Sequence, residues 1–472
     1  MVTEVPWEGT VMRRLLVSTL ALAGILLATD AWASGPPSWP VYLRDNSRDN
    51  AVQDGGSFGG GALQLAQSWA VGLGGPATAS LVIGDYAAYV PGSDGNLYAI
   101  NLATHQVIWK RFLGTRSTSS GTVGISSTPV YASDLGSKGA VLVGGGGQAQ
   151  ASDTHLYVYA LESKTGTILW QTAVGNAART SISDSPLYMD GHVYVATAGS
   201  AGGSVYVLDG QTGTILHKVS MAVPLKKGGG VSGSMSADSA GSRVFVPTGS
   251  GQNRRKQKLT FALVALNPQT LTVSGRWQAP AGQAKGKNGF GTSVTVFSSG
   301  SRRLIGAGMK SGMYYALDAA HLKKGPVWKR KLGNTGGSAH QVSDVVSAAY
   351  ASGPGYPDGG ALFVAAPNVK GGEVSGSGAL FALNPANGHV IWSVPVSGEP
   401  QDGAATVYDD LVILAVRNGT GGGAIEVRSA GNGHLLGSMS TTSVPASPVV
   451  VLYGDLYFAT SDGVFHVVNL KR

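Results

Sequence analysis

The sequence predicts an all-β fold, an eight-bladed β-propeller of four-stranded antiparallel blades that is closed by its N-terminal strand. The main observation is a repeat: a strand with alternating apolar residues, an Asp or Asn, a turn, and a strand that ends in Trp. The Trp or an equivalent residue recurs at positions 69, 109, 170, 217, 277, 328, 392 and about 436. Successive positions lie between 40 residues (69 to 109) and 64 residues (328 to 392) apart, a period typical of propeller blades.

Each repeat contains four strand-like runs. In the first repeat they cover 79–83, 86–90, 97–101 and 107–113, and each alternates with period 2 between Gly, Asp or Ser residues. The run before the turn recurs at 156–161, 205–209, 263–267, 314–318 and 380–384, with degenerate copies at 425–427 and 465–469. We therefore expect one propeller domain over residues 63–472, preceded by an N-terminal segment over 34–62.

The last repeat lacks one strand, because only 446–452, 456–460 and 464–470 precede the end of the sequence. The run 63–71, with Trp69 in the Trp position, supplies the missing strand. This pairing would close the ring and leave no sheet edge exposed to other chains. Because the Trp recurs at a similar offset from Asp or Asn in each copy, we expect it to have a packing role.

Residues 1–33 are predicted to be a secretory signal peptide, with 1–11 an upstream extension. Met12-Arg13-Arg14 precedes an apolar run of 14 residues over 15–28, and Ala31-Trp32-Ala33 fits the rule for signal-peptidase cleavage. A membrane anchor is the less favoured alternative, because ~20 apolar residues are needed to span a bilayer. We expect a periplasmic or secreted protein with no stable membrane insertion, and association with the outer membrane is left open.

The composition excludes several kinds of site. The chain of 472 residues contains no Cys, which rules out disulfides, thiolate metal sites and a lipidated N-terminal Cys. Asp and Glu total only 26, and a fold with few carboxylates has less stability to lose in acid. A Gly- and Ser-rich repeat protein without acid adaptation explains the composition as well. Basic runs are short, as in Arg254-Arg255-Lys256, so no nucleic acid is expected as a partner despite the net charge of +8.

The repeat resembles the pyrroloquinoline-quinone (PQQ)-like propeller repeat, whose pattern is roughly L-Y-A-L-D-x-x-T-G-x-x-x-W. The resemblance covers residues 39–472 and includes the start Trp39-Pro40-Val41-Tyr42-Leu43-Arg44-Asp45, which is similar to a W-P-M-F-R-x-D start. It implies the propeller fold. It does not imply one function, because the superfamily contains quinone-dependent dehydrogenases, assembly scaffolds and a hydrolase.

The dehydrogenase members are matched only in part. Their T-G-N turn, whose Asn binds calcium, corresponds to Thr248-Gly249-Ser250, and their acidic D-x-D segment corresponds to Asn288-Gly289-Phe290-Gly291. The K-x-G turn that contacts the quinone is kept as Lys310-Ser311-Gly312, but their adjacent cysteines are missing. Calcium needs six to eight oxygen ligands, and two expected ligands are lost. We therefore expect no cofactor and no metal, neither PQQ nor calcium.

Two other members of the PQQ-like superfamily bear on the function of this chain. The outer-membrane assembly scaffold needs a lipidated Cys, which this chain lacks. The tetrathionate hydrolase of acidophilic sulfur oxidisers is similar in architecture, size and acid-tolerant composition. Among these members, the chain is interpreted as most similar to the hydrolase.

The loops expected on one face of the ring carry more basic than acidic residues, which favours an anionic ligand. The basic residues are Arg116, Arg179, Lys226, Lys227, Arg254, Arg255, Lys256, Lys258, Lys285, Lys287, Lys310, Lys370 and Arg417. The acidic residues are Asp94, Asp153, Asp184, Asp344, Glu373, Glu399, Asp402 and Asp462. Solvated loop lysines are the simpler explanation for any single Lys in this set.

The candidate site residues come from this face. Lys310 lies at the turn that would hold a quinone, and the segment 336–344 enters the sixth blade with paired glycines that allow a ligand to approach the backbone. Asp344 is the candidate general base for water, because its reference pKa of about 3.9 suits a base in mild acid. Asp184, in a parallel segment of the third blade, is the alternative base. The expected substrate-binding residues are Lys310, His340, Arg254, Arg179 and Arg116.

The sequence therefore predicts an exported hydrolase of a small sulfur oxyanion such as tetrathionate, with an Asp-activated water in a basic central cleft. The alternatives are a PQQ-dependent alcohol dehydrogenase and a non-catalytic periplasmic scaffold of the outer-membrane assembly type. The expected partner is a small anionic substrate, and a homodimer is left open.

Overall fold

The computed structural model describes residues 38–472 except 78, 119–120, 151, 201, 226, 232, 239, 335–344, 371–373, 402, 420 and 447. The chain divides into two compact units, Met1–Gly35 and Pro36–Arg472. The predicted signal peptide falls outside the described residues and stays a prediction. No helix in the described part is long and apolar enough to cross a membrane.

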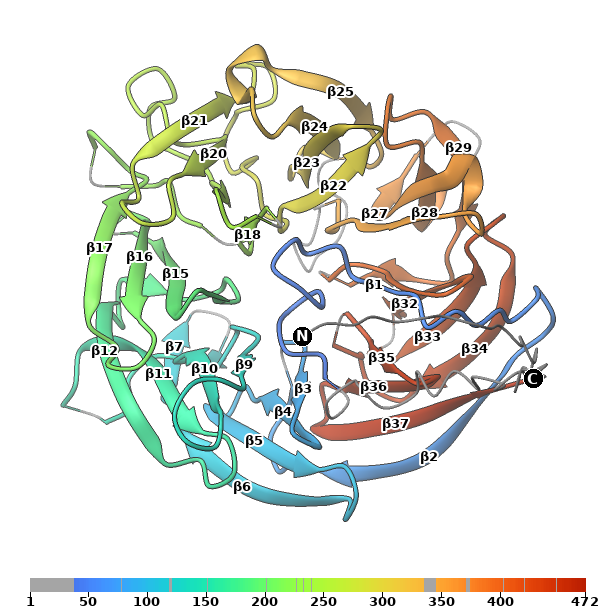
Figure 1. The fold of residues 1–472 in the computed structure, drawn as a ribbon, viewed down its shortest axis with the longest axis horizontal. Coiled ribbons are helices and arrows are strands. Elements are labelled where there is room, and N and C mark those ends of the chain that lie inside the picture. Colours follow the sequence, from blue (N-terminus) through green and yellow to red (C-terminus); the bar gives the residue numbers. More distant parts are fainter. Residues whose placement is uncertain are drawn as a thin grey trace, which may run out of the picture. The chain divides into compact units, whose positions relative to one another are not determined.

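In the second unit, eight sheets follow one another around a ring (Figure 1), as the repeat predicts. Blades 1 to 4 consist of β3 (Val82–Gly84), β4 (Ala87–Pro91), β5 (Asn96–Asn101) and β6 (Gln106–Phe112); β9 (Val130–Ala132), β10 (Ala140–Gly144), β11 (His155–Glu162) and β12 (Ile168–Asn176); β14 (Leu187–Met189), β15 (His192–Gly199), β16 (Ser204–Asp209) and β17 (Ile215–Ser220); and β18 (Ser236–Ala237), β19 (Val244–Pro247), β20 (Ala262–Leu266) and β21 (Val273–Gln278).

Blades 5 to 8 continue the same order and close the ring. They consist of β22 (Thr295–Ser299), β23 (Arg302–Gly308), β24 (Met313–Asp318) and β25 (Pro326–Lys331); β26 (Ala349–Ser352), β27 (Gly360–Val369), β28 (Gly376–Leu383) and β29 (Val390–Pro395); β31 (Thr406–Tyr408), β32 (Leu411–Arg417), β33 (Gly423–Ser429) and β34 (Leu435–Thr441); and β35 (Val450–Leu452), β36 (Asp455–Ala459), β37 (Val464–Lys471) and β2 (Gln64–Gly72).

The closure prediction is confirmed. β2 pairs antiparallel with β37, and Trp69 lies opposite Val467. Short elements outside the four-strand pattern are β1 (Ala51–Val52), β7 (Arg116–Thr118), β8 (Gly121–Val123), β13 (Thr180–Ser181), β30 (Glu399–Pro400) and the 3-10 turns η1 (Leu322–Lys324) and η2 (Pro357–Gly359). β1 pairs in parallel with β31, the innermost strand of blade 7.

The core lies between neighbouring blades. Every residue of β4, β10 and β20 is buried, because a middle strand is covered on both faces by adjacent blades. The outermost strand β6 instead alternates between exposed and buried residues. One buried cluster joins Tyr89 and Trp109 of blade 1 to Val141 of blade 2, which shows how adjacent sheets share a core.

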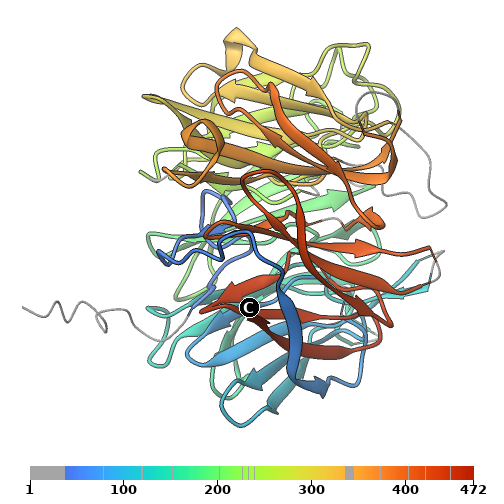
Figure 2. The same ribbon diagram turned by 90° about the vertical axis from the view of Figure 1, so that its right-hand side faces the viewer.

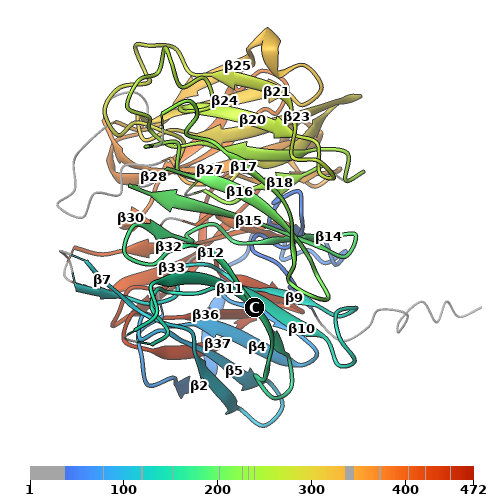
Figure 3. The same ribbon diagram turned by 90° about the vertical axis from the view of Figure 1, so that its left-hand side faces the viewer.

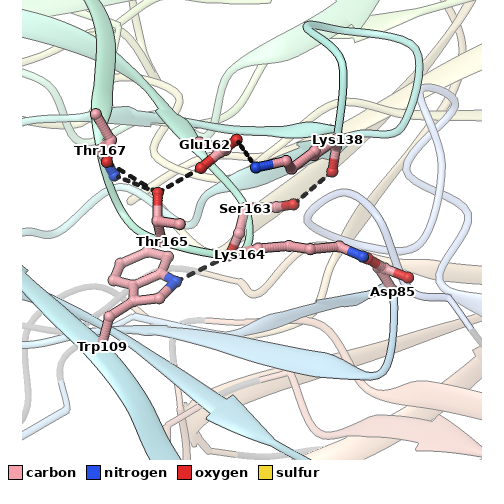
Figure 4. A network of polar contacts seen from close by, with 8 residues as sticks. All are labelled: Asp85, Trp109, Lys138, Glu162, Ser163, Lys164, Thr165 and Thr167. Atoms are coloured by element: carbon pink, nitrogen blue, oxygen red, sulfur yellow. Dashed lines mark hydrogen bonds and ion pairs between the residues drawn. The ribbon is translucent and has the colours of Figure 1, made fainter.

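The repeated Trp packs against the next blade. Trp109 Nε1 donates to the carbonyl of Ser163 at 2.9 Å, under the turn of blade 2 (Figure 4). A Cβ at Gly166 of that turn would lie 2.6 Å from the Trp109 ring, and Gly166 has a φ of +66°, so only Gly fits easily. The same arrangement recurs for the pairs Trp170–Gly213, Trp328–Gly388 and Trp392–Gly433.

Blade 4 departs from the expected register. Gly275 lies opposite Ala265, where other blades place their Trp, and Trp277 lies two residues further on, opposite Leu263. The Trp277 ring packs against Phe290 and Tyr315, and it lies less close to a turn glycine than the other Trp rings do, since a Cβ at Gly325 would lie 3.6 Å from Trp277 Nε1. A shift of two residues keeps the side chain on the same face of the strand, so blade 4 retains the aromatic contact.

Residues 39–52, here called the strap, cross one end of the ring (Figures 1 and 2). The strap meets the innermost region of blades 1 to 7 in chain order. Its backbone hydrogen bonds are Trp39 with Ile83 (2.8 and 2.9 Å), Tyr131 N to Pro40 O (2.7 Å), Ala237 N to Asn46 O (2.7 Å), Val296 N to Ser47 O (2.8 Å), Tyr350 N to Asp49 O (2.8 Å) and Val407 N to Asn50 O (3.0 Å). Blade 3 is reached by the side chain of Asn46, which donates to Tyr188 O at 3.0 Å.

Candidate functional site

A cavity of about 220 Å³ lies at the end of the inner strands opposite the strap. Its described lining residues are Gly199, Gly228, Gly230, Gly249, Ser250, Lys287, Gly289, Phe290 and Lys310, and we call it the glycine cavity. Phe290 precedes β22 in the chain, whereas the strap bonds Val296, the second residue of β22, so the segment 291–295 lies between the cavity and the strap. Figure 3 shows the two faces edge-on, with β7 and β30 on the side away from the strap.

Glycine is needed here because backbones of neighbouring blades touch. A Cβ at Gly249 would lie 2.9 Å from Gly230 O, and a Cβ at Gly289 would lie 2.5 Å from the Cα of Gly249. Backbone hydrogen bonds cross the same contacts, from Gly249 N to Gly230 O (2.7 Å) and from Lys310 N to Gly289 O (3.1 Å). The wall of the cavity is therefore fixed before any ligand binds.

The two charged residues in the described lining of the glycine cavity are both basic. Lys287 and Lys310 contribute to its lining, and none of the described lining residues is acidic. The described residues of the whole chain hold no group of three or more His, Cys, Asp or Glu that could bind a metal. A concave site with one sign of charge attracts the opposite sign, so the cavity suits an anionic group. Its volume is below the ~300–1,000 Å³ of sites that enclose a whole drug-sized ligand, so it suits part of a larger molecule.

The predicted site residues do not all gather in this cavity. Lys310 lines it, together with Ser250, Gly289 and Phe290 from the segments aligned with the dehydrogenase motifs. Asp344 and His340 lie outside the described residues and stay predictions.

The three predicted arginines lie elsewhere. Arg254 Nε donates to Ala279 O at 2.8 Å. Arg116 begins β7, and its Nε is buried without a hydrogen-bond partner among the described residues. Arg179 lines a different cleft, between blades 2 and 3.

Asp184 is buried and lies apart from the glycine cavity. Its side chain is 0% exposed, and Oδ2 accepts the Ala196 N–H at 3.0 Å. Burial raises the pKa of Asp184 to about 8, although the nearby charge of Arg48 opposes the shift. The pKa near 3.9 that was expected for a base in this segment therefore does not describe Asp184.

Sequence reasoning placed Lys287 only among the general basic residues. Its position follows from packing, because the loop before β22 folds against Gly249 in blade 4. The signal that could have found the cavity is a set of glycines near strand ends in blades 3 to 5. Gly228, Gly230 and Gly289 precede innermost strands, whereas Gly199 ends and Gly249 follows a second strand.

Two family models match parts of the chain. A family model described as "Outer membrane protein assembly factor BamB" matches residues 135–349 and 315–471. A second model, described as "Glucose/ethanol/alcohol dehydrogenase, beta-propeller domain", matches residues 84–183.

Individual proteins give a similar result. The chain is 24% identical over 369 residues to polyvinylalcohol dehydrogenase of Sphingopyxis sp. (strain 113P3), covering 66% of this chain and 52% of that protein. It thus spans about half the length of that relative. The quinohemoprotein alcohol dehydrogenase of Comamonas testosteroni has a similar structure, with a TM-score of 0.64 at 17% identity over 92% of this chain and 81% of that one.

The structure of BamB from Moraxella catarrhalis is also similar, with a TM-score of 0.56 at 14% identity, covering 87% of this chain and 98% of that one. At these identities the two solved structures support the fold alone.

These findings correct one expectation from the sequence. The prediction of no cofactor is wrong, because one matching family model is described as a glucose/ethanol/alcohol dehydrogenase propeller domain and one relative is named as a dehydrogenase. The prediction rested on missing calcium ligands, and the loss of metal ligands does not remove a binding site for an organic anion. The comparisons give no support to tetrathionate hydrolysis and favour the dehydrogenase alternative.

Proposed function

The chain belongs to the outer membrane protein assembly factor BamB family of PQQ-like propellers, and within this fold we propose that it works as a quinone-dependent alcohol dehydrogenase. The observation that carries the proposal is the glycine cavity. Three segments aligned with dehydrogenase motifs, at 249–250, 289–290 and 310, line one positively charged cavity. An anionic quinone cofactor would place one of its acidic groups there.

The residues of the cavity fit the organic part of such a cofactor. Lys287 and Lys310 would neutralise carboxylates, and the Ser250 hydroxyl would supply a further hydrogen bond. The glycine backbones allow a planar group to approach closely. The described lining holds no carboxylate for a metal ion, so no role for calcium is derived from it.

A bound quinone supplies the acceptor for the two electrons and two protons that an alcohol loses on becoming a carbonyl compound. The chain's own part is to hold that acceptor and to remove the hydroxyl proton. No acidic residue lines the described cavity, so Asp344, the base predicted from the sequence, is kept as the proposed proton acceptor. The protein would act outside the cytoplasm, in line with the predicted signal peptide.

A titration with pyrroloquinoline quinone tests the cofactor site directly. Fluorescence of the purified chain should report binding, and Lys310→Gln should weaken it by about tenfold or more, because a charge-assisted contact is lost. Lys323→Gln, on η1 and absent from the described lining, should leave the affinity unchanged. Absence of quinone binding by the folded chain, with or without calcium, would refute the proposal.

Turnover is the second measurement. Dye-linked oxidation of ethanol and of polyvinyl alcohol by the quinone-loaded protein should be detectable, and Asp344→Asn should lower the rate constant without lowering quinone affinity. Full activity of Asp344→Asn would remove this residue as the base while leaving the cofactor site standing.

A scaffold role is the second candidate. It is supported by the family match and by the BamB structure from Moraxella catarrhalis, 98% of which is covered by this chain. A folded protein that binds no quinone and shows no alcohol oxidation would favour this role over the dehydrogenase.

A further inference from the structure

A second cleft lies between blades 2 and 3, separated from the glycine cavity by the turn that joins β15 to β16. Its volume is about 490 Å³, within the range of small-molecule sites. We call it the inter-blade cleft. Its described lining residues are His155, Ala173, Val174, Gly175, Asn176, Arg179, Thr180, Thr197, Gly202, Ser204, Tyr206, Ile215 and Lys218.

The polar side chains of the cleft include those of His155, Arg179 and Lys218, and none of its described lining residues is acidic. Arg179 and Lys218 are cations, and neither forms an ion pair with a carboxylate among the described residues. His155 is held by Asp153, whose Oδ1 lies 2.9 Å from the Nδ1 of the ring. Three hydroxyl-bearing residues, Thr180, Thr197 and Ser204, share the lining. The cleft therefore combines positive charge with hydrogen-bonding groups.

Arg179 is carried by a rigid turn. Its N–H donates to Asn176 O at 3.0 Å, and its carbonyl accepts the Ser200 N–H at 3.0 Å. Thr180 Oγ1 also donates to Asn176 O, at 2.7 Å. A Cβ at Gly175 would lie 2.3 Å from Thr180 Oγ1, so glycine is required for the turn to pack. The backbone under the guanidinium is thus fixed before binding, which lowers the entropy cost of capturing a ligand.

Lys218 is positioned by the blade next to this turn. It lies directly opposite Tyr206 in the β16–β17 pair, and its ammonium lies 4.9 Å from the centre of the Tyr206 ring. The Tyr206 hydroxyl donates to Val174 O of blade 2, which fixes the ring at the junction of the two blades. The aromatic contact stabilises the ammonium without neutralising its charge.

We propose that the inter-blade cleft binds an oxyanion of the sulfate or phosphate class, free or carried by a larger molecule, through Arg179 and Lys218. The site is distinct from the glycine cavity, and the proposal does not depend on the dehydrogenase function. A planar guanidinium and an ammonium in the lining of one cleft suit a tetrahedral anion with several acceptor oxygens.

The molecule contains a matched control for this cleft. A cleft of about 520 Å³ at blades 6 and 7 is lined by Ser377, Ser397, Gly398, Glu399, Arg417, Asn418, Gly419 and Gly421. It also has an arginine, but Glu399 shares its lining, so the charges of its described lining residues balance. A similar size and an arginine are therefore common to both clefts, and of the two only the inter-blade cleft has an excess of positive charge among its described lining residues.

Calorimetric titration of the full chain with inorganic phosphate and with sulfate tests the proposal. The double variant Arg179→Gln/Lys218→Gln should lose affinity by about tenfold or more. Arg417→Gln should bind the anion like the wild type, and Lys310→Gln should retain the same binding event because it alters only the glycine cavity. Thermal unfolding of each variant checks that the fold is kept, and Arg179→Lys, which preserves charge, should recover part of the affinity.

Three results would overturn the proposal: no binding of either anion, unchanged affinity in the folded double variant, or loss of the binding event in Lys310→Gln alone. A competition with a phosphorylated peptide then identifies the source of the group. Displacement of phosphate by the peptide would support an anion carried on a protein, and failure to compete would support a free ion.

Discussion

The two ends of the inner strands differ in what their charged groups contact. At the strapped end, Arg48 is 0% exposed and donates to the carbonyls of Met235 (3.1 Å), Ser185 (3.1 Å), Pro186 (2.9 Å) and Tyr42. At the other end, Lys287 and Lys310 border a cavity. The comparison shows that the buried Arg48 links the strap to the ring at one end. At the other end, Lys287 and Lys310 line a cavity that a ligand can fill.

The strapped end also holds two carboxyl groups whose pKa values are raised. Burial raises the pKa of Asp184 to about 8, and burial together with Asp45 raises the pKa of Asp49 to about 7. Desolvation also lowers the pKa of Arg48 to about 10. Both carboxyl groups are easier to protonate in the folded chain than in the unfolded chain, so acid favours the strapped end.

The largest expected effect is at Arg48. Arg48→Met removes four hydrogen bonds and leaves buried carbonyl groups without donors, so the free energy of unfolding should fall by on the order of 3 kcal/mol or more. Arg44→Met is the control, because Arg44 is 40% exposed and reaches Asp49 only at 3.6 Å, and should cost less than about 1 kcal/mol. The measurement is the denaturant midpoint. Equal midpoints for the two variants would show that the strap does not hold the ring.

The next effect is on the pH dependence of stability. A raised carboxyl pKa means that the stability contributed by Asp184 is complete below its unfolded pKa near 4 and is lost as pH rises toward about 8. Between these values the wild type should lose up to about 1.4 kcal/mol per pH unit relative to Asp184→Asn, which does not titrate. Unfolding curves at pH 4, 6 and 8 measure this. Parallel pH profiles for the two proteins would mean that Asp184 is ionised in the fold.

The fold was predictable because its signals are local. The predicted run 107–113 corresponds to β6 (Gln106–Phe112), and the closing run 63–71 corresponds to β2 (Gln64–Gly72), since period-2 alternation and the repeat fix both. The Trp277 shift was missed, because the sequence does not show which of two same-facing positions meets the next blade.

The candidate site was predictable only in part. Lys310 and the segments at 249–250 and 289–290 were found through the resemblance to dehydrogenase motifs. Residues 249–250 and Lys310 follow the second strands of blades 4 and 5, and 289–290 lie in the loop that joins these blades. The burial of Asp184 was not predictable, because no local pattern shows that the fold brings this residue close to Arg48, which lies far earlier in the chain. Likewise, the repeat placed Arg179 on the correct kind of loop, but only the packing of blade 3 on blade 2 directs it to the inter-blade cleft.

A smaller effect is expected at the cavity wall. In Gly249→Ala the new Cβ would lie 2.9 Å from Gly230 O, so the wall must shift, and the free energy of unfolding should fall by about 1 kcal/mol. Quinone affinity should fall as well, because the cavity is shaped by this contact. Gly61→Ala is the control, since its Cβ would meet nothing within 4 Å. If Gly249→Ala kept full quinone affinity, the ligand would have to bind outside the glycine cavity.

The smallest effect on stability, and the sharpest contrast with Arg48, is expected at Lys287. Lys287→Gln removes a positive charge from the cavity without leaving a buried group unpaired, so the free energy of unfolding should change by less than about 0.5 kcal/mol. Quinone affinity should still fall severalfold, with a weaker dependence on salt, because one cation fewer faces the anion. Lys285→Gln, two residues earlier and absent from the described lining, should change neither quantity. A variant series in which Lys287→Gln lowered stability as much as Arg48→Met would show that both ends serve to hold the ring, and the functional contrast between them would be lost.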